Sequence, residues 1–188
     1  MEILFIDACL RKNSRTRALA TEVLNNLCGN ITELKLPEIP IPVIDENAVD
    51  KRHSHSVTGD FDDPMFNLAK QFASSDEIVI AAPFWDMSFP AVLKQYIEAI
   101  TVSGITFRYS EEGIPIGLCK AKNLYYVTTA GGPIFNSEFG FGYIKMLAEN
   151  MYGIKNCHFF KAENLDIIGN NVDDILEKSK FCINQFFK

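Results

Sequence analysis

The chain of 188 residues has no apolar run that approaches the roughly 20 residues needed by a membrane-spanning helix. It also has no basic surplus, because 24 acidic residues outnumber 18 lysines and arginines, for a net charge of −6. This balance argues against a nucleic-acid partner and against a surface drawn to anionic membranes. The N-terminus enters the apolar segment Ile3–Ile6 without a basic leader, so we expect no signal peptide and a cytoplasmic location.

Cysteine and histidine usage argues against a disulfide-stabilised protein and against a metalloprotein. The five cysteines are scattered, odd in number and without a CxxC pair, which fits a reducing compartment better than a disulfide framework. The three histidines, His53, His55 and His158, make no metal-ligand pattern, so we predict no metal site. There is no internal repeat and no low-complexity linker, and the length suits one domain with a sizeable core.

Strand-like and helix-like segments alternate along the chain. Five segments have the apolar or alternating pattern of strands: 3–6, 31–36, 77–82, 123–128 and 158–161. Five others have a helical pattern: 14–28, 64–74, 90–102, 138–152 and 172–187. This alternation predicts an α/β fold, a doubly wound five-stranded parallel sheet in the order 2-1-3-4-5 with helices on both faces.

Two stretches fall outside this alternation. The polar stretch from Asp45 to Asp63 is expected to be loop or irregular structure. Residues 103–121 are rich in glycine, so we predict a single domain over residues 1–188 with one excursion at about 103–121. We expect the apolar residues of the excursion to be exposed. These residues are Ile105, Phe107, Tyr109, Ile114 and Ile116. Such a surface is unusual for a monomer and predicts a self-complementary interface. The alternative is that the excursion folds onto its own sheet.

The loop after the first strand, residues 7–16, has the features of an anion site. It leads into a helix, whose N-terminal N–H groups and dipole favour an anion. Ser14 and Thr16 add hydroxyl donors, and four of the seven residues from 11 to 17 are basic in an otherwise acidic chain. This pattern favours a phosphate ligand, while the alternative is that Ser14 only caps the helix and the cations form a solvated face.

Two more loops are expected at the same edge of the sheet, because the carboxyl ends of parallel strands lie together. The loop Pro83–Phe89 holds the only tryptophan, Trp85, and its flat apolar side chains suit a flat ring system such as a flavin. The alternative is that these aromatic residues cap the core. The loop 128–133 contains Gly131 and Gly132, which let a backbone approach a ligand closely, although an ordinary turn also explains them.

The first loop also supports a rival hypothesis. Cys9, followed after five residues by Arg15-Thr16, has the C-x5-R-[ST] spacing of low-molecular-weight protein tyrosine phosphatases. A cysteine-dependent phosphatase would use Cys9 as the thiolate nucleophile, Arg15 in the anion cradle and Asp63 as a general acid. However, Asp63 precedes the third strand, whereas that family has its Asp-Pro late in the chain, and the two later loops stay unexplained.

Several stretches together resemble the FMN-dependent NADH-azoreductase and NAD(P)H:quinone oxidoreductase group of flavodoxin-like proteins. They span most of residues 1–135 and comprise Ser14–Thr16, Pro40–Asp45, Pro83–Met87 with Pro90–Ile97, Gly104–Tyr109 and Gly131–Gly132. The resemblance implies a flavodoxin-like homodimer with FMN as cofactor and NADH or NADPH as electron donor. The implied small-molecule substrate is a quinone, an azo compound or a similar electron-poor acceptor, and the chemistry needs no side-chain nucleophile and no metal.

Carried over residue by residue, the resemblance implies a complete site. Ser14, Arg15 and Thr16 hold the FMN phosphate. The isoalloxazine is lined by Pro83, Phe84, Trp85, Asp86 and Met87, and its pyrimidine edge is approached by Thr129, Ala130, Gly131 and Gly132. Phe107 and Tyr109 form the substrate pocket of a neighbouring chain. The alternative within this fold is a flavodoxin-type electron carrier, which has less use for an excursion that builds a pocket.

One departure from the family concerns Asp86, where the family usually has asparagine. An ionised carboxylate beside the ring would disfavour the anionic reduced flavin and lower its potential, unless it faces solvent or a hydrogen-bond donor.

Overall fold

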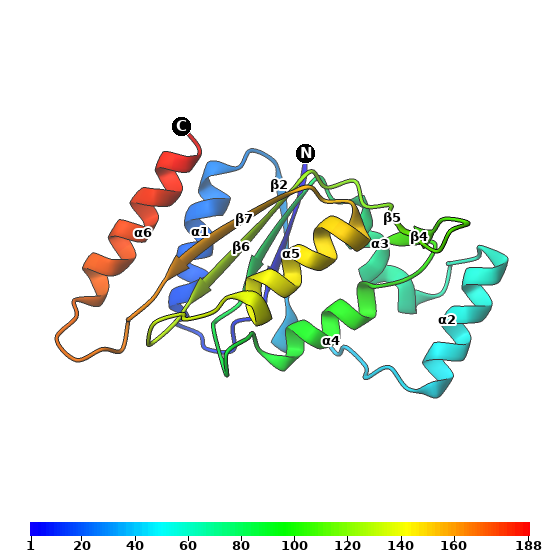
Figure 1. Cartoon of the computed structure of the whole chain (residues 1–188), viewed down its shortest axis with the longest axis horizontal. Coiled ribbons are helices and arrows are strands. Elements are labelled where there is room, and N and C mark those ends of the chain that lie inside the picture. Colours follow the sequence, from blue (N-terminus) through cyan, green and yellow to red (C-terminus); the bar gives the residue numbers. More distant parts are fainter.

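A five-stranded parallel sheet forms the centre of the computed structural model, which describes all 188 residues (Figure 1). Its strands are β1 (Glu2–Asp7), β2 (Asn30–Lys35), β3 (Glu77–Ala81), β6 (Asn123–Thr129) and β7 (Asn156–Ala162). They lie in the order β2-β1-β3-β6-β7, and each neighbouring pair is parallel. Counted along the chain, this is the order 2-1-3-4-5, so the predicted fold class is confirmed.

Helices cover both faces of the sheet, with α1 and α6 on one side and α3, α4 and α5 on the other (Figure 1). The six α-helices are α1 (Arg15–Asn26), α2 (Glu46–Thr58), α3 (Asn67–Ser74), α4 (Ala91–Ile100), α5 (Tyr143–Leu147) and α6 (Val172–Phe186). Wider π-helical turns, Glu138–Gly142 and Ala148–Tyr152, extend α5 at both ends, so helical structure covers the whole predicted segment 138–152. No helix of the protein has the length and apolarity that crossing a membrane requires.

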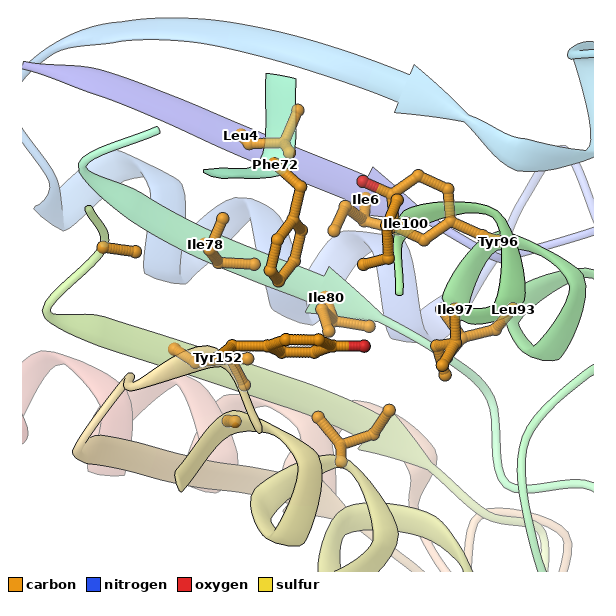
Figure 2. Packing of buried hydrophobic residues seen from close by; sticks show 14 of the residues in the cluster. Leu4, Ile6, Phe72, Ile78, Ile80, Leu93, Tyr96, Ile97, Ile100 and Tyr152 are labelled. Atoms are coloured by element: carbon orange, nitrogen blue, oxygen red, sulfur yellow. The ribbon is translucent and has the colours of Figure 1, made fainter. Parts of the chain in front are cut away.

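Alternate residues of each central strand feed two separate cores, because successive side chains of a strand point to opposite faces. Leu4 and Ile6 belong to a cluster of 22 buried residues that includes Tyr96 of α4 (Figure 2). Ile3 and Phe5 belong to a second cluster of 14, which lies against α1 and α6. A strand buried on both faces has a continuous apolar sequence, which explains why β1 and β3 are recognisable from sequence alone.

The expectation of irregular structure between residues 45 and 63 is wrong, because α2 occupies Glu46–Thr58. Its start is capped by Asp45, whose carboxylate accepts the N–H of Ala48 at 2.8 Å. Its end is set by Gly59, which takes a left-handed φ of 72°. No residue of α2 is buried, so this helix lacks the apolar stripe on which a periodicity argument depends.

Three side chains attach α2 to the body of the protein, and one of them is Lys51, which forms an ion pair with Asp63 at the start of the 3-10 turn Pro64–Phe66. The guanidinium of Arg52 donates to the carbonyls of Glu98 and Ala99 at 2.9 and 3.1 Å, where α4 ends. The ring of His55 meets the ring of Phe66 edge-on, with 5.1 Å between the centroids. Figure 1 shows α2 standing clear of the two helical layers.

The excursion folds into an antiparallel hairpin of β4 (Phe107–Tyr109) and β5 (Pro115–Gly117). It lies at the amino edge of the sheet, since Lys120 N–H donates to the carbonyl of Ala73 at the end of α3 (Figure 1). The expectation that Phe107 is exposed is wrong, because Phe107 packs into its own chain and is 6% exposed. Tyr109, by contrast, is 55% exposed.

Candidate functional site

A cavity of about 410 Å³ opens at the carboxyl edge of the sheet. It is bounded by the three loops that the sequence singles out, after β1, β3 and β6, and by a fourth loop after β7. The lining residues are Leu10, Arg11, Asn13, Ser14, Arg15, Thr16, Pro83, Phe84, Trp85, Thr129, Ala130, Gly131, Leu165 and Asp166. The size and the position are those of a ligand site in an open α/β sheet.

The first loop presents a row of free backbone donors. None of the N–H groups of residues 10–16 donates a hydrogen bond to another protein group. The last of them, Thr16, is 1% exposed. Residues 10–13 and 15 are exposed, so their N–H groups are open to a ligand, and an anion with several acceptor oxygens suits such a row at the N-terminus of a helix.

Two hydroxyl groups of this loop have defined roles. Ser14 is the N-cap of α1, and its Oγ accepts the N–H of Arg17 at 3.3 Å, so Ser14 caps the helix and also lines the cavity. A hydroxyl that accepts in this way keeps its own proton for a further acceptor. Thr16 Oγ1 lies 2.6 Å from Thr129 Oγ1 and so joins the loop after β1 to the loop after β6.

The cluster of basic residues divides into two groups. Arg17 is turned toward the buried carboxylate of Asp7, to which two guanidinium nitrogens donate, and it also lies 3.2 Å from Glu33. Arg17 is therefore absent from the cavity lining, whereas Arg11 and Arg15 are part of it. Asp7 Oδ1 also accepts the N–H of Cys9 at 2.9 Å, which fixes the start of the loop.

The thiol of Cys9 lacks the environment of a nucleophile. Burial, followed by a hydrogen bond to Asp7, raises the pKa of Cys9 to about 12, so the thiol stays protonated at neutral pH. Cys9 does not line the cavity, and its Sγ lies 3.8 Å from the carbonyl of Ala81. The hydrogen bond from Lys51 lowers the pKa of Asp63, which is the reverse of what a general acid needs. Nothing in this geometry supports the phosphatase hypothesis.

The aromatic loop turns back on itself in four residues. Trp85 and Ser88 exchange two backbone hydrogen bonds of 3.1 and 2.8 Å. Between them, Asp86 and Met87 both have positive φ, 50° and 67°, as in a type I′ turn. Pro83, Phe84 and Trp85 line the cavity, and the turn leaves Asp86 and Met87 exposed outside it. Asparagine and aspartate tolerate this backbone region better than most residues, so Asp86 suits its place in the turn.

The loops after β6 and β7 are joined by backbone hydrogen bonds. Leu165 N–H donates to the carbonyl of Ala130 at 3.2 Å, and Asp166 N–H donates to that of Gly131 at 2.8 Å. Thr129, Ala130 and Gly131 thereby reach the cavity, whereas Gly132 does not line it.

Five lining residues are not among those predicted from the sequence: Leu165 and Asp166 in the loop after β7, and Leu10, Arg11 and Asn13 in the first loop. No sequence pattern marks residues 165 and 166, since their position depends on the pairing of β7 with β6. Phe107 and Tyr109 do not line the cavity of their own chain, because the hairpin lies at the opposite edge of the sheet.

Comparison with known proteins identifies the family. The profile of a family described as having a flavodoxin-like fold matches residues 1–181, and the chain belongs to this family. The FMN-dependent NADH:quinone oxidoreductase of Coprothermobacter proteolyticus is 30% identical over 201 residues, with coverage of 98% of this chain and 99% of that protein.

Other relatives match over a shorter stretch or in structure only. The protein of the same name from Clostridium perfringens is 40% identical over 116 residues, and the match spans 61% of this chain and only 58% of that relative. The azoreductase structure from Bacillus anthracis has a TM-score of 0.84 at 20% identity, with coverage of 100% of this chain and 98% of that chain. At this identity the structure supports the fold alone.

Proposed function

We propose that this chain is an FMN-dependent oxidoreductase that passes electrons from NADH or NADPH to a quinone, an azo compound or a similar electron-poor acceptor. The relatives from Coprothermobacter proteolyticus and Clostridium perfringens are named as FMN-dependent NADH:quinone oxidoreductases. The observation that carries the proposal is one cavity with two unlike sets of lining residues. Free backbone donors and arginines form one set, and Pro83, Phe84 and Trp85 form the other.

The residues present fit FMN at both ends. The free N–H groups of residues 10–16, at the positive end of the α1 dipole, suit phosphate oxygens, and Ser14 and Arg15 add side-chain donors. We assign Thr16 to the same end through its N–H group, because its hydroxyl is shared with Thr129. The apolar surface of Phe84 and Trp85 suits a flat ring, and the small residues Ala130 and Gly131 leave room for its edge.

The tasks of the protein in this reaction are binding, orientation and exclusion of water. Bound FMN supplies the redox chemistry between the nicotinamide and the acceptor. The hydrogen bond between the hydroxyls of Thr16 and Thr129 holds the phosphate end and the ring end at a fixed separation. Trp85 is 38% exposed, so one side of the aromatic wall faces outward, where a small-molecule substrate has access.

We further propose that the working unit is a homodimer. Exposed apolar side chains, including Met87, Phe139 and Met146, lie near the aromatic loop, and a groove of about 550 Å³ runs between Phe89 and Met146. Tyr109 lies far from the cavity of its own chain, so we assign it to the substrate pocket of the partner chain. The ring of Phe107 packs edge-on against the ring of Tyr109, with 5.3 Å between the centroids and an interplanar angle of 90°.

The alternative within the family is an electron carrier that binds FMN without a substrate pocket. Purified protein reconstituted with FMN and titrated anaerobically with NADH separates the two. Flavin absorbance that bleaches with NADH and returns when a quinone is added supports the oxidoreductase. Bound flavin that NADH does not bleach indicates the carrier, and a chain that binds no FMN contradicts both.

The free, scattered cysteines support a cytoplasmic location.

A further inference from the structure

Arg15, the cation at the first position of α1, already has an anionic partner inside the cavity. Its Nη1 lies 2.7 Å from Oδ1 of Asp166, and both side chains line the cavity. Asp166 belongs to the loop after β7, so the ion pair bridges the first and the fourth loop. A carboxylate at this place is unexpected in a site that should attract phosphate, and it has no role in the function proposed above.

The position of this carboxylate is built into the neighbouring loop. The backbone N–H of Asp166 donates to the carbonyl of Gly131 at 2.8 Å. A Cβ atom on Gly131 would lie only 2.4 Å from Oδ2 of Asp166, so the glycine makes room for the carboxylate. Gly131 does not have a positive φ, so its backbone conformation gives no other reason for a glycine.

We propose that Asp166 competes with the phosphate of FMN for Arg15. Only an anion that binds more strongly than this carboxylate displaces Asp166 from the arginine. A phosphate monoester carries about −1.5 to −2 charge at pH 7 and has three acceptor oxygens. A carboxylate carries one charge, and Asp166 uses none of the free N–H groups of residues 10–16. A phosphate engages Arg15 and those N–H groups together, so it displaces Asp166, whereas a weaker anion does not.

The inference rests on the proposed FMN site and is tested by binding rather than by activity. The dissociation constants of FMN and riboflavin are measured by fluorescence titration for the wild type and for Asp166→Asn. We expect Asp166→Asn to bind FMN about two- to fivefold more tightly, since an exposed ion pair is a weak competitor. Riboflavin lacks the phosphate, so its affinity should not change.

Two further variants serve as controls. Asp166→Ala also removes the charge and should tighten FMN binding about two- to fivefold, as Asp166→Asn does. Asp62→Asn removes the same charge at a fully exposed site outside the cavity, and FMN affinity should stay unchanged. A loss of FMN affinity in Asp166→Asn, or no change, would overturn the inference, because the carboxylate would then orient Arg15 or be irrelevant to it. A wild-type chain that binds neither flavin would instead overturn the proposed function itself.

Discussion

Replacement of Asp7 by asparagine tests the arrangement beneath the phosphate loop. Asp7 is completely buried at the end of β1 and pairs with Arg17, while its other oxygen accepts the N–H of Cys9. Breaking a fully buried ion pair costs about 3–5 kcal/mol. Here the Arg17 side chain is 32% exposed and keeps Glu33 as a partner at 3.2 Å, so we expect a loss of about 2–3 kcal/mol.

Equilibrium unfolding in urea, followed by circular dichroism, measures this loss. With a slope of about 2–3 kcal/mol per molar urea for a chain of this size, the midpoint should fall by about 1 M. Asp7→Ala should lower the free energy of unfolding by about a further 1–3 kcal/mol. The buried N–H of Cys9 then lacks its acceptor, which asparagine preserves. Glu33→Gln is the matched control, and it should change stability by under about 1 kcal/mol because this pair is exposed.

The reasoning is refuted if Asp7→Asn and Glu33→Gln have the same unfolding free energy. That result would show that Arg17 satisfies its charge in solvent and that Asp7 gains nothing from the pair.

Four further predictions concern the cavity and its surroundings. Cys9→Ser should keep FMN affinity and NADH-dependent reduction within a few-fold, since its thiol is protonated and outside the cavity; loss of all activity with flavin still bound would contradict the oxidoreductase. Asp86→Asn should shift the flavin midpoint potential by less than about 10 mV, because the carboxylate is exposed and about 30 mV corresponds to 1.4 kcal/mol. Met87→Gly should raise stability by about 0.5–1 kcal/mol in urea, since glycine relieves the positive φ. Tyr109→Ala should weaken quinone reduction more than FMN binding, and light scattering at micromolar concentration should give the mass of two chains; a single-chain mass with full activity would exclude an obligate dimer.

The sheet and its loops are readable from sequence where burial leaves a continuous or periodic apolar pattern. β1 and β3 are buried on both faces, and the helix from 90 to 102 has a clear apolar side, so each is found close to its true limits. The helix α2 is missed because none of its residues is buried. Its only sequence signals are the capping residues Asp45 and Gly59 at its ends. Local capping signals therefore carry information that composition does not.

The site is predictable as far as it follows from single loops. The row of donors at residues 10–16 and the aromatic wall at Pro83–Trp85 each depend on a strand followed by its own loop. Asp166 depends instead on how two strands pair and on the space beside a glycine, and a single sequence does not display either. The partners of Arg15 and Arg17 are likewise tertiary, so the sequence shows a run of like cations where the structure shows two opposite roles.

The attachment of α2 has a consequence for local dynamics. Since none of its residues is buried, opening this helix in a single chain exposes little apolar surface beyond the ring of Phe66, and it costs mainly the contacts of Lys51, Arg52 and His55. Its amide protons should therefore exchange with solvent long before those of β1 and β3, which open only when the cores come apart. The chain thus carries a helix that is able to melt and reform while the sheet and the cavity at its carboxyl edge stay intact.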